Sequence, residues 1–121
     1  MAEYKRVIHA ADGRALVPHA RWCDSFGSKL RGFTWRRSLA PGEGLVLVQS
    51  GESRVNSAIH MLFVFFDLGV FWVDEAGEVV DVALARPWRL HYAPRAPARY
   101  VVETHPDVLS QVQVGDRILF D

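Results

Sequence analysis

Residues 70–84 read VFWVDEAGEVVDVAL, and they contain the clearest structural pattern in the chain. Two runs rich in β-branched and aromatic residues lie on either side of Glu75-Ala76-Gly77. Such runs favour extended strands, and a short break that contains glycine is typical of a β-hairpin. This segment therefore predicts two neighbouring antiparallel strands.

The chain before this hairpin also carries strand signals. Asp12-Gly13 separates two runs with apolar residues, 4–10 and 15–22. This pattern predicts an N-terminal hairpin that covers residues 1–19 and whose second strand continues to residue 22. The apolar run 44–48 predicts a buried strand, followed by a polar loop. Residues 57–73 are almost wholly apolar with a break at Asp67-Leu68-Gly69, which favours two buried extended segments, and a buried helix is the alternative.

Two short helices and two further strands complete the expected fold. Asp24 or Ser25 can cap a helix that ends near Gly32, and His105 can cap another that begins at Pro106. Residues 100–102 and 118–120 read as strands, whereas 86–98 hold three prolines and predict a loop over the sheet. We expect one α+β domain spanning residues 1–121, a mostly antiparallel β barrel or rolled sheet with two short helices.

Composition excludes several classes of protein. The chain has 121 residues, half of them hydrophobic, with 14 Lys and Arg against 14 Asp and Glu, so disorder is excluded and no overall charge favours nucleic acid or an anionic membrane. Cys23 is the only cysteine, which excludes an internal disulfide framework. The five histidines show no metal-ligand spacing, so we expect no metal and no cofactor.

No targeting or membrane segment is evident. The longest uncharged run, residues 55–66, has 12 residues, whereas a bilayer span needs about 20. The N-terminus lacks the apolar region of a signal peptide. We therefore expect a soluble, cytoplasmic protein that does not engage a membrane.

Seven short motifs, taken in order, resemble one family. They are LRGF (30–33), GEGL (42–45), IHMLF (59–63), VFWVDEAGEVV (70–80), PW (87–88), YVVE (100–103) and VGD (114–116). Together they cover about residues 20–120 and are similar to the small prokaryotic family called domain of unknown function 192. The resemblance implies a compact, single-domain, β-rich fold and no assigned reaction.

The sequence departs from the family pattern at three places. Phe33 stands where the family usually has an aliphatic residue, and Asp107 lies near an expected glycine. Asp67 and Gly69 replace an expected Pro-x-Asp. If that aspartate serves the family's function, this chain has lost it or has moved it to Asp67.

Arginine and aromatic residues alternate in two segments. One segment holds Arg21, Lys29, Arg31, Arg36 and Arg37 beside Trp22, Phe26, Phe33 and Trp35, and the other holds Arg86, Arg89, Arg95 and Arg99 beside Trp88, His91 and Tyr92. This composition suits phosphates, bases and other anionic partners, although an ordinary arginine-rich surface has it too. We expect Trp88 and the loop of residues 86–99 to form part of a binding surface.

His60 and Glu103 each interrupt or end an apolar strand, so each needs a partner. Arg31 and Arg99 are the candidate cations. Such a group is either a satisfied polar contact inside the fold or the floor of a pocket. The candidate ligand-binding residues are therefore Arg31, His60, Trp88, Arg89, Arg99 and Glu103.

These observations favour a binding or accessory protein that recognises a small anionic ligand or a protein partner through its arginine-aromatic face. Two alternatives stay open: a small hydrolase with His60 as general base, and a binder of RNA or single strands. Binding is preferred because no nucleophile-base spacing is readable. Cys23 reads as a half-buried, inert thiol rather than a nucleophile.

Overall fold

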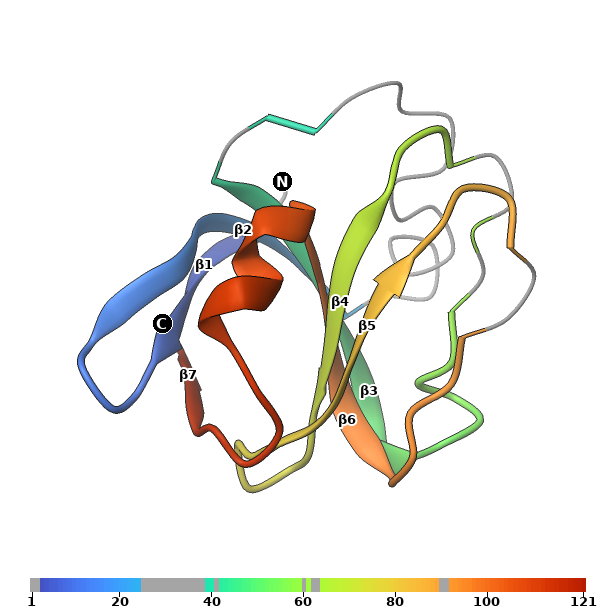
Figure 1. Ribbon diagram of the computed structural model, residues 1–121. Coiled ribbons are helices and arrows are strands. Elements are labelled where there is room, and N and C mark those ends of the chain that lie inside the picture. Colours follow the sequence, from blue (N-terminus) through green and yellow to red (C-terminus); the bar gives the residue numbers. More distant parts are fainter. Residues whose placement is uncertain (1–2, 25–38, 41, 60, 62–63, 90–91) are drawn as a thin grey trace.

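A computed structural model describes residues 3–24, 39–40, 42–59, 61, 64–89 and 92–121. Its main element is a curled sheet of seven strands, a half-barrel, in the order β5-β4-β6-β3-β2-β1-β7 (Figure 1). The strands are β1 (Glu3–His9), β2 (Arg14–Cys23), β3 (Glu43–Ser53), β4 (Leu68–Val73), β5 (Val79–Ala85), β6 (Ala98–Thr104) and β7 (Ile118–Phe120). The prediction of a β-rich single domain is confirmed.

Both predicted hairpins are present. Strands β4 and β5 pair antiparallel, as do β1 and β2, and Gly13 has the positive φ of 74° that the Asp12-Gly13 turn requires. The one parallel pair among the named strands, β2 with β3, joins residues 19–23 to 43–47. The two ends of the sheet approach each other at an isolated antiparallel bridge between Glu78 and Arg117.

One short helix is described. It is the 3-10 helix η1 (Pro106–Gln111), and His105 caps it by accepting a hydrogen bond from the Asp107 backbone N–H at 3.2 Å. The predicted helix near residues 24–32 lies almost entirely outside the described residues. The expectation of two short helices is therefore not confirmed.

The sheet has a hydrophobic cluster on each face. Alternate residues of β4 separate the two clusters: Phe71 and Val73 belong to the inner one with η1, and Val70 and Trp72 to the outer one. Figure 1 shows η1 on one side of the sheet and the described residues of segments 54–66 and 86–97 on the other. Because β4 is buried on both faces, its sequence is continuously apolar instead of alternating.

Two sequence predictions need correction. The expected polar loop after residue 48 is mostly strand, since β3 continues to Ser53. The run 57–73 supplies one strand of the sheet, β4. The described residues of 57–66 lie over the outer face of the sheet and form no strand pairing with it. The described residues of 57–66 are mostly apolar because they pack on buried residues of the sheet, and burial alone does not distinguish that role from a strand.

Candidate functional site

The turn at residues 86–89 has an unusual backbone. Pro87 and Trp88 form the turn, and Trp88 adopts a φ of +65°, the only positive value found among the described residues other than glycine. A bulky L-residue is strained there, by about 1–2 kcal/mol, and glycine is the ordinary occupant. Strain of this kind persists only where surrounding contacts impose it, and it is common at functional sites.

Backbone hydrogen bonds to Met61 and Ile59 hold this turn. The Trp88 backbone N–H donates to the Met61 carbonyl at 2.7 Å, and the Met61 N–H donates to the Arg89 carbonyl at 2.7 Å. Ile59 and Tyr92 exchange two further backbone hydrogen bonds, of 2.8 and 2.9 Å. Met61 is fully buried in the outer cluster, so the turn is fastened to the core of the domain.

The side chains of this turn face solvent. Trp88 is 48% exposed and meets Phe65, 38% exposed, edge-on with 5.6 Å between ring centroids. Arg89 is exposed, and the Arg86 Nη1 lies 3.7 Å from the Asp67 Oδ2. We call these five residues, Phe65, Asp67, Arg86, Trp88 and Arg89, the Trp88 face. Two of the residues singled out in the sequence, Trp88 and Arg89, thus lie together.

Replacing Trp88 tests the strain directly. We expect Trp88→Gly to be more stable than Trp88→Ala by about 1 kcal/mol, because glycine accepts the positive φ and alanine does not. Both variants lose the same contact with Phe65, so that loss cancels in the comparison. Urea denaturation of the two variants measures the difference. The usual order, with alanine above glycine, would contradict the assignment of strain.

Arg99 does not join the Trp88 face or Glu103. Its Nε donates to the Gln49 carbonyl at 3.0 Å, its Nη1 lies 3.8 Å from Glu75, and its guanidinium carbon lies 5.3 Å above the ring of Tyr100. Arg99 and Glu103 are four residues apart on β6, a separation of about 13 Å in a strand. The cation expected to neutralise Glu103 is therefore engaged elsewhere.

Glu103 is buried in the outer face of the sheet. It is 6% exposed, and its neighbours across the sheet are Leu45 on β3 and Val70 on β4. No described residue forms a hydrogen bond or ion pair with its carboxyl group. Burial raises the pKa of Glu103 from 4.5 to about 7, because desolvation disfavours the charged form.

Two other candidates, Arg31 and His60, lie outside the described residues, as does the proposal of His60 as a general base. Cys23, expected to be half-buried, is fully buried in the outer cluster. A buried thiol in apolar surroundings is not an accessible nucleophile. Within the described ranges, no three His, Cys, Asp or Glu side chains gather closely enough to hold a metal ion.

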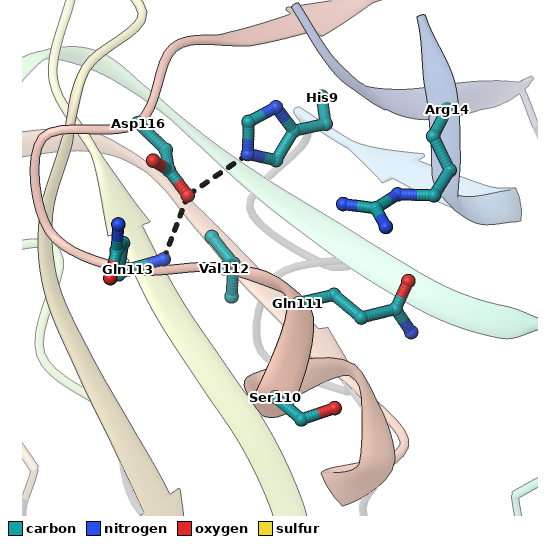
Figure 2. Close-up of a pocket in the computed structure, with 7 residues that line it drawn as sticks. All are labelled: His9, Arg14, Ser110, Gln111, Val112, Gln113 and Asp116. Carbon is teal, nitrogen blue, oxygen red and sulfur yellow. Dashed lines mark hydrogen bonds and ion pairs between the residues drawn. The ribbon is translucent and has the colours of Figure 1, made fainter. Parts of the chain in front are cut away.

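A polar hollow that the sequence did not reveal lies beside the β1–β2 hairpin (Figure 2). Its residues come from the tip of the β1–β2 hairpin, His9 and Arg14, and from residues 110–113 and Asp116. His9 and Asp116 are 107 residues apart, and their side chains meet at 3.0 Å. The only sequence signal was the pair of turns, Asp12-Gly13 and Gly115-Asp116, whose proximity requires knowing that β1 pairs with β7.

Comparison with known proteins agrees with the motifs in the sequence. The model of the family DUF192, described as "Uncharacterized ACR", matches residues 7–120. The chain belongs to this family. A UPF0127 protein of Thermococcus gammatolerans is 34% identical over 117 residues, which cover 95% of this chain and 74% of that protein. A UPF0127 protein of Pyrococcus furiosus is 31% identical over 114 residues, covering 93% and 95%.

Solved structures share the fold. A Sinorhizobium meliloti protein described as a "putative transcription regulator" has a TM-score of 0.83 at 22% identity, covering 99% of this chain and 94% of that one. A Novosphingobium aromaticivorans protein of unknown function has a TM-score of 0.75 at 14% identity, covering 98% and 84%. No described helix is long and apolar enough to cross a membrane. These comparisons show no specific function for the family.

Gly69, where the resemblance led us to expect an aspartate, lies at a close packing contact. A Cβ at this position would lie 3.1 Å from the His105 carbonyl oxygen and 3.1 Å from the Leu109 side chain. Gly69 therefore permits η1 to pack closely against β4. The neighbouring acid, Asp67, lies beside Arg86 on the Trp88 face.

Proposed function

We propose that this protein is a binding module that recognises an acidic segment of a partner protein through the Trp88 face. The observation that carries the proposal is the strained, solvent-exposed Trp88, in a turn held by two backbone hydrogen bonds to Met61, one from Trp88 and one to Arg89. Tryptophan and arginine dominate the binding energy of many protein interfaces. A rigid turn presents them with little further loss of entropy on binding.

Charge supports an acidic partner. Residues 86–99 contain four arginines and no acidic residue. Arg86, Arg89 and Arg95 are exposed, and Arg95 reaches 86% side-chain exposure although its Nε lies 3.6 Å from Asp81. Guanidinium groups bind carboxylates through paired hydrogen bonds. An acidic peptide that also offers an apolar contact to Trp88 complements this surface.

A protein partner is favoured over nucleic acid by the balance of charge. The chain has no net charge, and Asp67 lies within the face beside Arg86. Binding to a phosphate backbone relies on several uncompensated cations and is steeply weakened by salt. A single exposed indole with flanking arginines is closer to an interface hot spot than to a series of stacking rings.

Peptide selection tests the proposal without knowledge of the partner. Random short peptides are selected for binding to the wild-type protein and counter-selected against Trp88→Gly. We expect the enriched peptides to be rich in Asp and Glu and to bind Trp88→Gly at least about tenfold more weakly, a loss typical of a hot-spot residue. Arg89→Gln should weaken the binding of the same peptides, whereas Arg6→Gln, outside the face, should not.

Three results would overturn the proposal. The first is the absence of enriched peptides, and the second is enrichment without acidic residues. The third is binding of a single-stranded oligonucleotide that falls steeply with salt and is lost in Trp88→Gly, since it assigns the face to nucleic acid. Thermal melting of each variant confirms that the folded protein is being compared.

A further inference from the structure

The hollow between the β1–β2 hairpin and the segment after η1 has a volume of about 420 Å³. This lies within the range of small-molecule sites, about 300–1,000 Å³. His9 pairs with Arg14 across the β1–β2 hairpin. Val112, which also lines the hollow, belongs to the inner hydrophobic cluster. The hollow therefore lies where the curled sheet's inner face meets solvent, and the mouths of curled and closed sheets are common places for ligands.

One wall of the hollow is rigid. The Asp116 Oδ2 lies 3.0 Å from His9 Nε2 and accepts a hydrogen bond from the Gln113 backbone N–H at 2.9 Å. The backbone N–H of Ala10 donates to the Arg117 carbonyl at 2.9 Å, which fastens the hairpin tip to the segment before β7. Figure 2 shows the imidazole of His9 and the carboxylate of Asp116 side by side at this wall.

Two carboxylates near the hollow each have a hydrogen-bond partner within the protein. Asp116 uses its Oδ2 for His9 and Gln113. Asp12 accepts a hydrogen bond from the Arg14 backbone N–H at 3.0 Å, and that bond lowers the pKa of Asp12. The nearest approach of Asp12 to the Arg14 side chain is 3.8 Å, at Nε. This contact is an ion pair at Nε that is too long for a hydrogen bond, and it does not involve the two terminal nitrogens.

The terminal nitrogens of Arg14 are thus available. No described residue bonds to them, and Figure 2 shows the guanidinium extending between His9 and Gln111. The amide of Gln111 and the hydroxyl of Ser110 line the same hollow. A planar guanidinium beside an amide donor matches the two oxygens of a carboxylate or phosphate group.

We propose that this hollow binds a small molecule carrying a carboxylate or phosphate group, with Arg14 as the principal ligand-binding residue and Gln111 as a second donor. The site is independent of the Trp88 face, because it lies on other elements and uses none of the same residues. His9 acts as a wall of the site, since its Nε2 faces Asp116 and its Nδ1 lies 3.4 Å from the Ala11 N–H.

Titration followed by ¹H–¹⁵N NMR tests this site, with inorganic phosphate and acetate as the two probes and sodium chloride at equal ionic strength as the reference. We expect saturable shifts confined to residues of the hollow, caused by at least one of the two probes. Tighter binding of phosphate assigns a phosphate group to the ligand, and tighter binding of acetate assigns a carboxylate. Shifts that chloride reproduces would show an effect of ionic strength only and would overturn the proposal.

Variants locate the binding residue. Arg14→Gln should weaken binding at least about tenfold, the scale of one lost charge-assisted hydrogen bond, and Arg14→Lys should fall between it and the wild type. Arg6→Gln, at an exposed arginine that pairs with Asp121, is the matched control and should bind like the wild type. The proposal fails if Arg14→Gln binds normally, or if Arg6→Gln loses binding equally. Arg14 is exposed, so its variants are expected to fold, and a melting curve checks this.

Discussion

Replacing Trp72 by alanine is expected to destabilise the protein by about 3–5 kcal/mol, the usual cost of removing a large buried aromatic side chain. Trp72 is 1% exposed and lies on β4 in the outer cluster. Its Nε1 donates to the Ser57 carbonyl at 2.7 Å, so it joins the sheet to segment 54–66. Urea denaturation measures the loss of stability.

Trp72→Phe separates the hydrogen bond from the ring. Phenylalanine keeps most of the apolar contact but leaves the buried Ser57 carbonyl without the indole donor, at a cost of about 1–3 kcal/mol. Native-state hydrogen exchange should then accelerate at the backbone amides of Ile59, Trp88 and Tyr92 more than in the strands. The hydrogen bonds of these amides join segment 54–66 to the loop of residues 86–97 over the outer face of the sheet, and we call these two segments the cover.

Phe71 provides the matched control. It is adjacent to Trp72 and fully buried, but it packs in the inner cluster. Phe71→Leu should lower global stability without selectively exposing segment 54–66. If both variants accelerate exchange uniformly, the indole does not anchor the cover, and the Trp88 turn must be held by other contacts.

The limits of prediction from sequence follow from the range of the interactions. The two hairpins were predictable because a turn signal and its flanking strands lie within about twenty residues. The parallel pairing of β2 with β3 was not, since no local signal specifies which distant strand lies beside a given one. The contact between His9 and Asp116 depends on such pairing, and the hollow was therefore missed.

The Trp88 face was predicted in part. Arginines, an indole and three prolines marked residues 86–98 as a surface loop, and the described residues of this loop do lie over the sheet. The strain at Trp88 was not predictable, because a Pro-Gly pair indicates a positive φ at its second residue and a Pro-Trp pair does not. The exposure of Phe65 was hidden as well, since its apolar segment was expected to be buried, as an extended segment or a helix.

Glu103 illustrates a different limit. The sequence showed a charged residue at the end of an apolar strand and demanded a partner, and Arg99 was one candidate. Arg99 instead contacts Gln49 and Glu75. A carboxyl group can also meet the cost of burial by remaining protonated, and composition cannot distinguish this solution from an ion pair.

Stability should consequently fall as the pH rises from about 4.5 to about 7, and Glu103→Gln should abolish that fall. The folded-state pKa of Glu103 is about 7 and its ordinary value is 4.5, so the folded protein holds this proton after the unfolded chain has released it. The stability that this proton contributes is fully present below the pKa of Glu103 in the unfolded chain, and it is lost as the pH rises through the pKa in the folded protein. A shift of this size corresponds to about 3 kcal/mol.

Urea denaturation of both proteins across this pH range measures the effect. Glutamine has nearly the same shape as a protonated glutamate, so the variant should match the wild type near pH 4 and exceed its stability by about 3 kcal/mol near pH 8. Glu75→Gln, at an exposed position, is the control and should keep the wild-type slope. Parallel curves for Glu103→Gln and the wild type would mean that Glu103 is ionised in the folded protein and that a cation neutralises it. In that case the carboxylate would belong to a charged site, as the sequence first suggested, instead of being a neutral acid beneath the cover.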